Sequence, residues 1–395
     1  MSTSLTPRRS DQKRYLNLDD YSAAAQRLLP RALFAYVSGS AGDGEALAAN
    51  RDAFKQWALI PQQLRGVASR SAATELLGQR FAMPIGVSAF GAAAVLGYNA
   101  DIAMAAAAYN ANVPYQLSAN SITPMEEVIK VNPEAWFAAY LPDDAALIRG
   151  VVERVSNAGF KTLVITVDVP VAARREPETR AGYAMPFKAS ARLGFDMLRH
   201  PRWVLSRFTR TLLRRGIPHI ENVTPQRGPS IFASNTGSIG GAANFNWDNI
   251  RAIRAQWPGK LLLKGILAER DAIMAQEIGV DGVIVSNHGA RLSDSSIAPL
   301  EALPNIRAAC PELTVLLDGG VRRAGDALKA IALGADGVMI GRPLFYATIL
   351  GGRRGLAHAL HLLSAELDRE MGFHGLLNVN EVREEDRLYR RAPLA

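Results

Sequence analysis

The chain has 395 residues, of which 48% are hydrophobic and 21% are charged, which is the composition of a folded globular protein and excludes an intrinsically disordered one. Its 33 glycines and 21 prolines indicate many tight connections between buried elements, as in an α/β fold. A single cysteine excludes an intramolecular disulfide and predicts a reducing, cytoplasmic compartment. The net charge of +8 is compatible with binding to nucleic acid, an anionic ligand or a membrane surface. The location of the charged residues along the chain is needed to choose among these partners.

The N-terminal residues 1–14 are polar and lack the apolar stretch of a secretory signal, so export is not expected. Residues 1–80 are predicted to form an N-terminal helical cap, with Leu28, Leu29, Leu33 and Tyr36 on one face. The stretch 81–100 carries no charge, but prolines and glycines interrupt it. We therefore expect a buried strand and a glycine-rich loop there, and no membrane span.

From residue 81 onward, apolar runs of strand length recur, separated by stretches with the spacing of amphipathic helices. The eight predicted strands are Pro84–Ala89, Val113–Leu117, Ala135–Tyr140, Thr162–Val167, Leu261–Lys264, Gly282–Ser286, Thr314–Leu317 and Gly337–Ile340. The predicted helices are Ala100–Asn110, Asp143–Ala158, Trp247–Trp257, Ala268–Ile278, Ala298–Ala309, Ala324–Leu333 and Leu356–Met371. Eight such units predict that residues 81–395 form a (β/α)8 TIM barrel, with one long insertion, residues 183–245, after the fourth strand.

A polar residue or a glycine follows every predicted strand. Because the carboxyl ends of barrel strands and their loops carry the chemistry of this fold, the pattern predicts one site built from all eight ends. The positions are Gly91, Ser118, Tyr140, Thr166 with Asp168, Lys264, Ser286 with His288, Asp318, and Gly341 with Arg342.

The most informative segment runs from Val283 to Arg291, where His288 leaves a buried strand three residues before an arginine. A titratable base beside a permanent cation suits proton abstraction from a substrate whose carboxylate must be held. A structural, hydrogen-bonded histidine is the alternative. The position at a strand end, with Asp318 available from the next strand, favours the catalytic interpretation.

Glycines and arginines close the last two strands, in Asp318-Gly319-Gly320-Val321-Arg322 and in Gly341-Arg342-Pro343. Glycines expose backbone N–H groups, and loops after strands seven and eight form the usual phosphate site of this fold. The two segments together predict a phosphorylated cofactor. No metal site is predicted.

These segments, together with Ser286-Asn287-His288-Gly289-Ala290-Arg291, resemble the FMN-dependent 2-hydroxy-acid oxidoreductases, which include glycolate oxidase, lactate dehydrogenase and mandelate dehydrogenase. The resemblance runs from about residue 18 to residue 389. It implies an FMN cofactor and oxidation of an (S)-2-hydroxy acid to the 2-oxo acid, with hydrogen passed to the flavin N5.

The resemblance also implies roles for single residues. His288 would be the base, paired with Asp318, and Lys264 would lie by the flavin N1/O2 edge. Substrate would be bound by Tyr36, Tyr140, Arg175 and Arg291. Cofactor contacts would come from Ala89, Gly91, Ser118, Thr166, Lys264, Ser286, Asp318, Gly319, Gly320, Arg322, Gly341 and Arg342.

Two positions depart from the family pattern. Ala89-Phe90-Gly91 stands where the family usually has Pro-Thr-Gly or Pro-Thr-Ala, and Ala138 stands where it usually has a glutamine that contacts the flavin. Both changes imply a lost side-chain contact to the ring. An FMN barrel of different chemistry, or a degenerate barrel that only binds flavin or another anion, are therefore alternative interpretations.

The insertion holds most of the positive charge. Residues 183–227 contain nine basic residues and only two acidic ones, interleaved with aromatic and aliphatic residues. This pattern predicts a peripheral contact of residues 187–215 with anionic lipid at the inner face of the cell membrane, and a quinone or other carrier as electron acceptor. A solvated lid over the barrel is the alternative. Nothing resembles a nucleic-acid-reading motif, and a homo-oligomer is expected.

Overall fold

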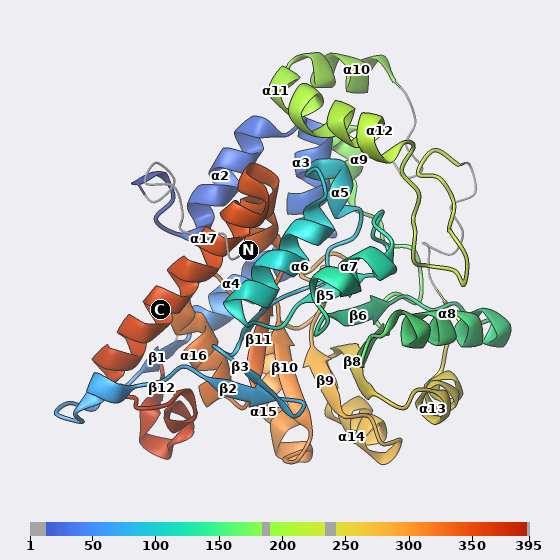
Figure 1. Ribbon diagram of the computed structural model, residues 1–395. Coiled ribbons are helices and arrows are strands. Elements are labelled where there is room, and N and C mark those ends of the chain that lie inside the picture. The colour runs from blue at the N-terminus through green and yellow to red at the C-terminus, as the bar shows by residue number, and fades with distance from the viewer. Residues whose placement is uncertain (1–12, 184–189, 234–241, 393–395) are drawn as a thin grey trace.

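The computed structural model describes residues 13–183, 190–233 and 242–392, and its centre is an eight-stranded parallel barrel (Figure 1). The sheet order is β4-β11-β10-β9-β8-β7-β6-β5, and a parallel bridge between Val87 and Tyr115 joins its two ends. All eight predicted strands are confirmed. Their bounds are β4 (Ile85–Val87), β5 (Gln116–Ser118), β6 (Trp136–Ala139), β7 (Thr162–Thr166), β8 (Lys260–Ile266), β9 (Gly282–Val285), β10 (Thr314–Asp318) and β11 (Gly337–Ile340).

The barrel interior is filled by side chains that alternate along the strands, as a two-residue period requires. Gly86 makes room for them, because a Cβ at this position would lie 2.7 Å from the Met339 sulfur. A hairpin of β2 (Thr74–Leu76) and β3 (Gln79–Phe81) contributes to the same cluster at the amino-terminal end. Its buried members are Leu76, Phe81, Trp136, Ala138, Val164, Leu262, Ile284, Leu316 and Met339.

Helices surround the barrel, and the predicted ones are present with small shifts at their ends. Two points differ: α7 was not predicted, and α17 begins directly after β11 and continues through a kink at Gly352, where φ is 56°. Their bounds are α6 (Ala100–Ala111), α7 (Met125–Val131), α8 (Ala145–Ala158), α13 (Trp247–Gln256), α14 (Glu269–Glu277), α15 (Pro299–Ala309), α16 (Ala324–Ala332) and α17 (Arg342–His374). A further short helix, α5 (Ala93–Leu96), follows β4.

The N-terminal region is helical only up to Lys55. It contains α2 (Leu18–Leu28), α3 (Arg31–Ser38) and α4 (Glu45–Lys55), and Pro30 separates the first two because proline is favoured at a helix start and not inside. After these helices the chain forms β1 (Trp57–Leu59), which pairs antiparallel with β12 (Leu388–Arg390) near the other end of the chain. The expectation of helix throughout residues 1–80 is therefore wrong for residues 57–80.

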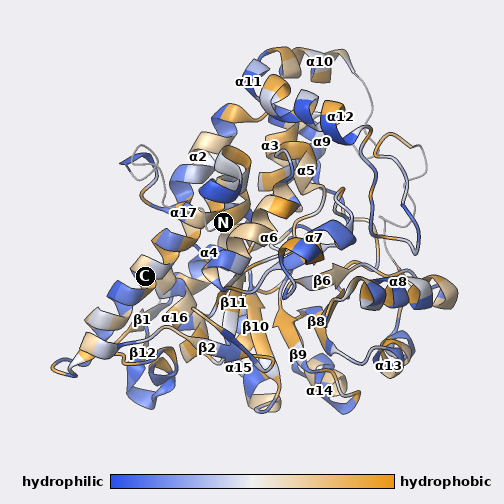
Figure 2. Ribbon diagram, in the orientation of Figure 1, coloured by the Kyte–Doolittle hydropathy of each residue, from blue (hydrophilic) through white to orange (hydrophobic). Residues whose placement is uncertain are grey.

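The insertion forms a short helical projection at the end of the molecule where α3, α5 and α9 (Glu176–Ala181) lie (Figure 1). Its described part contains α10 (Ala191–Leu198), α11 (Pro201–Trp203), a π-helical turn η2 (Val204–Phe208) and α12 (Thr209–Arg215). Figure 2 shows hydrophobic and hydrophilic stretches alternating along it. Trp203 is fully buried, and its indole N–H donates to the Leu96 carbonyl at 3.0 Å, which anchors the projection on α5.

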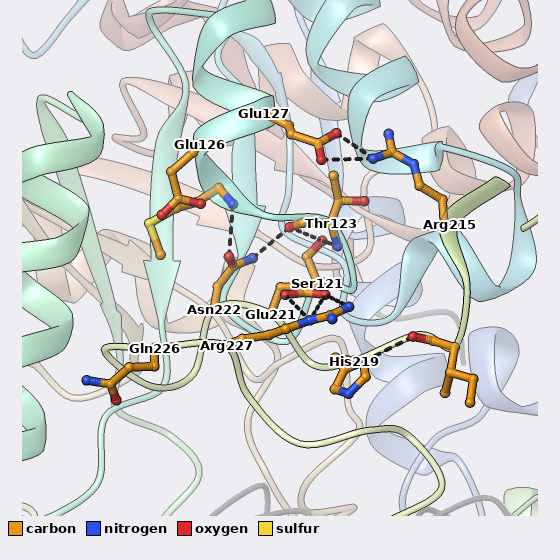
Figure 3. Close-up of polar contacts among 12 residues, drawn as sticks. Ser121, Thr123, Glu126, Glu127, Arg215, His219, Glu221, Asn222, Gln226 and Arg227 are labelled. Carbon is orange, nitrogen blue, oxygen red and sulfur yellow. Dashed lines mark hydrogen bonds and ion pairs between the residues drawn. The ribbon is translucent and has the colours of Figure 1, made fainter. Parts of the chain in front are cut away.

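The chain returns from the projection along a segment that is tied to the barrel by polar contacts (Figure 3). Asn222 is completely buried; its amide donates to the Thr123 carbonyl at 2.9 Å and accepts from the Met125 N–H at 2.9 Å. Arg154 of α8 contacts both sides of this junction, since it pairs with Glu126 at 2.8 Å and donates to the Glu221 carbonyl at 2.8 Å. The base of the insertion is thus fixed, whereas its apolar tip residues are exposed.

Candidate active site

A cavity of about 740 Å³ lies at the carboxyl ends of the strands. Its walls include residues from the ends of β4, β6, β7, β8, β9, β10 and β11, from α3, and from both described ends of the insertion. Among the residues predicted from the sequence, the lining includes Tyr36, Ala89, Gly91, Tyr140, Thr166, Arg175, Lys264, His288, Arg291, Asp318, Gly319, Gly320, Arg322, Gly341 and Arg342. Ser118 and Ser286 do not line the cavity. They are buried.

His288 lies in this cavity with both ring nitrogens in contact with polar groups. Nδ1 donates to Asp168 Oδ1 at 3.0 Å, and Nε2 lies 3.3 Å from the Tyr140 hydroxyl. The expected pairing of His288 with Asp318 is therefore wrong. Sequence reasoning placed Asp168 at a strand end but did not identify it as the partner, because only the packing of β7 beside β8 and β9 brings these two loops together.

Burial alone would raise the pKa of Asp168, but the charge and hydrogen bond of His288, together with the charge of Lys264, outweigh burial and lower it. The carboxylate is therefore charged at neutral pH and holds the proton on Nδ1. In the neutral imidazole, that tautomer would leave Nε2 able to accept a proton on the cavity side. The close approach of Asp168 requires Gly265, since a Cβ there would lie 2.4 Å from the Asp168 Cβ.

The loop that carries His288 has an unusual backbone. His288, Gly289 and Ala290 all have positive φ angles, of 56°, 64° and 60°, in a region that non-glycine residues rarely adopt. Side chains hold the loop in place: the Ser286 hydroxyl accepts from the His288 N–H at 3.0 Å, and Asn287 Oδ1 accepts from the Ala290 N–H at 3.0 Å. Such locally strained, over-determined segments are common where a catalytic side chain is aimed.

Asp318 belongs to a second polar cluster beside the histidine. It accepts hydrogen bonds from the hydroxyls of Ser88 at 2.6 Å and Ser286 at 3.3 Å. The Lys264 ammonium lies 3.8 Å from Asp318 and donates to the Ser286 hydroxyl at 2.9 Å. Asp318 therefore neutralises and orients Lys264, a buried cation on the cavity wall.

Two arginines and a glutamate form the opposite side of the cavity. Arg291 donates to the carbonyls of Tyr36 at 2.8 Å and Gly39 at 3.1 Å and to Glu178 at 2.8 Å. Arg175 lies 3.6 Å from Glu178 and donates to the Arg291 carbonyl. Burial raises the pKa of Glu178, although both arginines oppose this. Glu178 was not predicted from the sequence. It lies in the highly charged helix α9, and nothing in that local pattern indicates that this glutamate is buried.

The wall between these groups is aromatic. Tyr36 stacks on Tyr183 at a centroid distance of 4.7 Å and contacts the edge of Phe90, and Phe90 stacks on Phe345 at 3.9 Å. The Tyr36 hydroxyl donates to the Gly91 carbonyl at 3.0 Å. Phe90, which replaces a usual threonine of the family, therefore packs into this aromatic wall.

Three observations indicate that the residues of the cavity fit FMN. Arg342 is partly buried and donates to the carbonyls of Val37, Gly39 and Gly289. Burial, and then the charge of Arg291, lower its pKa to about 9. Burial also lowers the pKa of Arg322, so a doubly charged phosphate would relieve both partly buried cations. In addition, the buried Thr166 hydroxyl of the lining has no hydrogen-bond partner among the described residues. A flavin ring atom can supply that partner.

Comparison with known proteins defines the class of protein to which this fold and site belong. The profile of the FMN-dependent dehydrogenase family matches residues 25–389. The chain is 35% identical over 368 residues to (S)-mandelate dehydrogenase of Pseudomonas putida, covering 93% of this chain and 92% of the relative. It is 37% identical over 372 residues to L-lactate dehydrogenase of Azorhizobium caulinodans, covering 92% and 96%.

Solved structures agree. The crystal structure of the monotopic membrane protein (S)-mandelate dehydrogenase has a TM-score of 0.87 at 34% identity, covering 95% of this chain and 100% of that one. Mandelate oxidase with (S)-2-phenylpropionate has a TM-score of 0.79 at 30% identity, covering 96% and 99%. The chain belongs to the FMN-dependent 2-hydroxy-acid oxidase and dehydrogenase family. It is a TIM-barrel flavoprotein oxidoreductase whose cofactor is FMN.

Proposed function

We propose that the protein oxidises an (S)-2-hydroxy acid of the lactate or mandelate type and that His288 is the catalytic base. The observation that carries this proposal is the His288–Asp168 pair, with Nδ1 held by a buried carboxylate at 3.0 Å and Nε2 on the cavity side beside Tyr140. Nε2 takes a proton from the substrate, and Asp168 stabilises the resulting imidazolium. FMN, when bound, accepts the electron pair that the α-carbon loses.

Arg175 and Arg291 are proposed to bind the substrate carboxylate. Both line the cavity, and Glu178 with the α3 carbonyls fixes the orientation of Arg291 before substrate arrives. Preorganised guanidinium groups lose little freedom when they bind a carboxylate in two-point contacts. Tyr140, 3.3 Å from His288 Nε2, is placed to donate to the substrate oxygen that develops charge, and Tyr36 lines the same side.

The side chain of the substrate is proposed to be large and apolar. The cavity wall includes the aromatic residues Phe90, Tyr183 and Phe245 and the smaller apolar residues Val169 and Ala173. A phenyl ring would bury more apolar area against this wall than the methyl group of lactate, at roughly 25 cal/mol per Å². The mandelate dehydrogenase of Pseudomonas putida is similar over nearly the whole chain, which supports the same choice.

FMN is proposed to be held at its two ends by different groups. Arg322, Arg342 and the exposed backbone of Gly319, Gly320 and Gly341 would bind the phosphate. Lys264 and Thr166 would contact the ring, with Ala89 and Gly91 offering backbone groups. Ser118 and Ser286 would act from behind this lining, and Asp318, which is part of it, would orient Lys264.

We further propose that the protein docks peripherally on the inner face of the cell membrane and passes electrons to a quinone or similar carrier. Phe195, Leu198, Leu205 and Leu213 of the projection are 56%, 78%, 71% and 81% exposed among many arginines, as an interfacial segment on anionic lipid requires. A relative with this fold is described as a monotopic membrane protein. In the described part of the chain, no helix is long and apolar enough to span a bilayer. The homo-oligomer stays a prediction.

The test is anaerobic reduction of the bound flavin by (S)-mandelate and by L-lactate, followed as loss of the yellow absorbance. The wild type should be bleached, and His288→Ala should retain FMN but be reduced roughly 10²–10⁴-fold more slowly, the usual contribution of a general base. Reduction of the variant at the wild-type rate would remove His288 from the mechanism.

A further inference from the structure

A second cavity, of about 520 Å³, lies outside the active site between α2, the first turns of the insertion and the kinked helix α17. Five arginines line it, and we call it the arginine cavity: Arg14, Arg27, Arg199, Arg202 and Arg207. They come from two stretches far apart in the sequence, residues 14–27 and 199–207, and α17 supplies a third wall, so the cavity exists only in the folded chain. Figure 1 shows the insertion helices at the top, with α2 and the upper part of α17 below them.

None of these five arginines forms an ion pair with a carboxylate of the described residues. Arg14 lies over the Tyr15 ring and Arg199 over the Phe195 ring, and Arg207 donates to the Leu350 carbonyl at 3.2 Å and to Ser206 at 2.8 Å. Asp196, the acidic residue of α10, contacts His200 and the Ala32 N–H instead. The positive charge of the cavity is therefore not compensated locally.

The inner wall of the arginine cavity is polar, and none of the described residues that line it is acidic. Tyr21 and His358, both buried, meet there at 2.5 Å between hydroxyl and Nδ1. Gly351 and Gly355 line the cavity on either side of the α17 kink, where Gly352 has a φ of 56°. Charge-assisted hydrogen bonds to an anion are the interaction that such a set of converging guanidinium groups forms best.

We propose that the arginine cavity binds a phosphate group, carried by an anionic phospholipid of the membrane on which the projection rests. Burial of Arg207 and the nearby charge of Arg210 lower the Arg207 pKa, which a phosphate would reverse. The cavity adjoins α10, where Phe195 and Leu198 are exposed. A lipid whose acyl chains run beside these residues can place its headgroup between Arg199, Arg202 and Arg27. The inference that the phosphate belongs to a lipid rests on the proposed membrane docking, whereas the inference that the cavity binds phosphate does not.

The first experiment titrates the FMN-loaded protein with a short-chain, monomeric phosphatidylglycerol and, separately, with inorganic phosphate, by calorimetry. Two cavity variants are compared with controls that remove the same charge nearby. Arg199→Gln with Arg202→Gln is matched by Arg192→Gln with Arg214→Gln, which lie outside the cavity on α10 and α12. Arg27→Gln on α2 is matched by Arg31→Gln on α3. The flavin spectrum and turnover with 2-hydroxy acid report that each variant is folded.

We expect the phosphatidylglycerol to bind one site, and both cavity variants to lose about tenfold or more in affinity, since hydrogen bonds to charged groups contribute roughly 1.5–3 kcal/mol each. The two controls should bind it like the wild type. Equal loss in cavity and control variants, or no binding of either probe to the wild type, would overturn the proposal.

Two further outcomes distinguish a lipid phosphate from free phosphate, and phosphate binding in the cavity from membrane docking. Inorganic phosphate that binds as tightly as the lipid would overturn the lipid source and assign the cavity to free phosphate. Vesicles of phosphatidylcholine with about a fifth phosphatidylglycerol test docking itself. If the monomeric lipid binds through the cavity but these vesicles are not bound, the docking proposal fails while phosphate recognition stands.

Discussion

At the scale of single residues, the site depends on two aspartates with different partners. Asp168 holds the Nδ1 proton of His288, whereas Asp318 accepts from Ser88 and Ser286 and lies 3.8 Å from Lys264. Both are buried carboxylates beside cations, so charge alone does not distinguish them. Their different contacts predict different defects.

Asp168→Asn should slow flavin reduction roughly 100-fold, because a neutral amide neither fixes the histidine tautomer nor stabilises the imidazolium. Asp318→Asn should instead weaken FMN binding, since Lys264 loses its counter-charge, while reduction of the FMN that remains is less affected. Stopped-flow reduction and flavin retention on dialysis measure the two effects. The same defect in both variants would contradict the separate roles.

The lowered pKa of Asp168 also fixes the direction of its pH dependence. Because the folded-state pKa lies below the unfolded one, the stabilisation by this pair is present above the ordinary value of 3.8. It is lost only as the pH falls through the lowered folded-state pKa. The pair is therefore intact across the neutral range.

Arg342 provides the second residue-scale prediction. It is a partly buried cation whose pKa falls to about 9, so its charge needs an anion. Arg342→Gln should weaken FMN binding by roughly 10–100-fold, the loss of a charge-assisted contact. Arg342→Lys should not restore binding, because an ammonium cannot span three carbonyls and a phosphate. Fluorescence titration of the FMN-free protein measures both. Wild-type affinity in Arg342→Gln would remove this residue from the phosphate site.

At the scale of elements, helix α6 carries a buried acid in its first turn. Asp101 is 0% exposed, accepts from the Thr123 hydroxyl at 2.9 Å, and has a pKa raised to about 6 by burial, which the hydrogen bonds of Thr123 and Ser121 only partly oppose. A helix N-terminus favours the charged carboxylate and would by itself lower the pKa of Asp101. The pKa is raised nevertheless, because the cost of burying the charge is larger.

Because this pKa is higher in the folded state, the folded chain binds more protons between about pH 4 and pH 6, and stability falls as the pH rises through that window. The cost above it is about 3 kcal/mol, from roughly two units at 1.36 kcal/mol each. Asp101→Asn should remove this loss, as measured by urea unfolding at several pH values. The exposed Glu153→Gln on α8 serves as control, and a variant that keeps the wild-type pH profile would contradict the assignment.

The base and the tip of the insertion differ in how they contact the rest of the protein. The return segment is fixed by Asn222 (Figure 3) and by Arg154, and Trp203 anchors the projection on α5. Phe195 and Leu198 of α10 and Leu213 of α12 are exposed. A rigid base with an apolar tip is the arrangement that a docking element needs.

At the scale of the whole molecule, the projection lies at the same end as the cavity mouth, since it follows β7 at the carboxyl end of the barrel. Leu205→Ser with Leu213→Ser should weaken binding to anionic vesicles by roughly tenfold per leucine, at about 1.5 kcal/mol for each side chain. Flavin reduction should be unchanged. Leu64→Ser with Ile273→Ser, two exposed positions outside the projection, is the matched control for co-sedimentation.

The same geometry predicts that reduced enzyme transfers electrons faster to a short-chain quinone than to oxygen. Rapid hydrogen peroxide formation without an added acceptor, together with vesicle binding equal in the leucine variant and the control, would show that the projection is only a lid.

The sequence by itself determined the barrel, the glycine-rich loops after β10 and β11 that we propose bind the phosphate, and the position of His288. These features are local: strand periodicity, glycines at strand ends and a histidine after an apolar run each depend on neighbouring residues. The family resemblance added the remaining lining residues in their order along the chain.

Only the tertiary structure decided which residues of the site contact each other. Asp168 replaces Asp318 as the partner of His288 because the β7 loop, with Gly265 of β8 beneath it, packs against the β9 loop. Glu178 meets Arg291, 113 positions further along the chain, and the arginine cavity forms where α2, the insertion and α17 converge. Such contacts join residues more than a hundred positions apart, and their geometry depends on packing that no local pattern encodes.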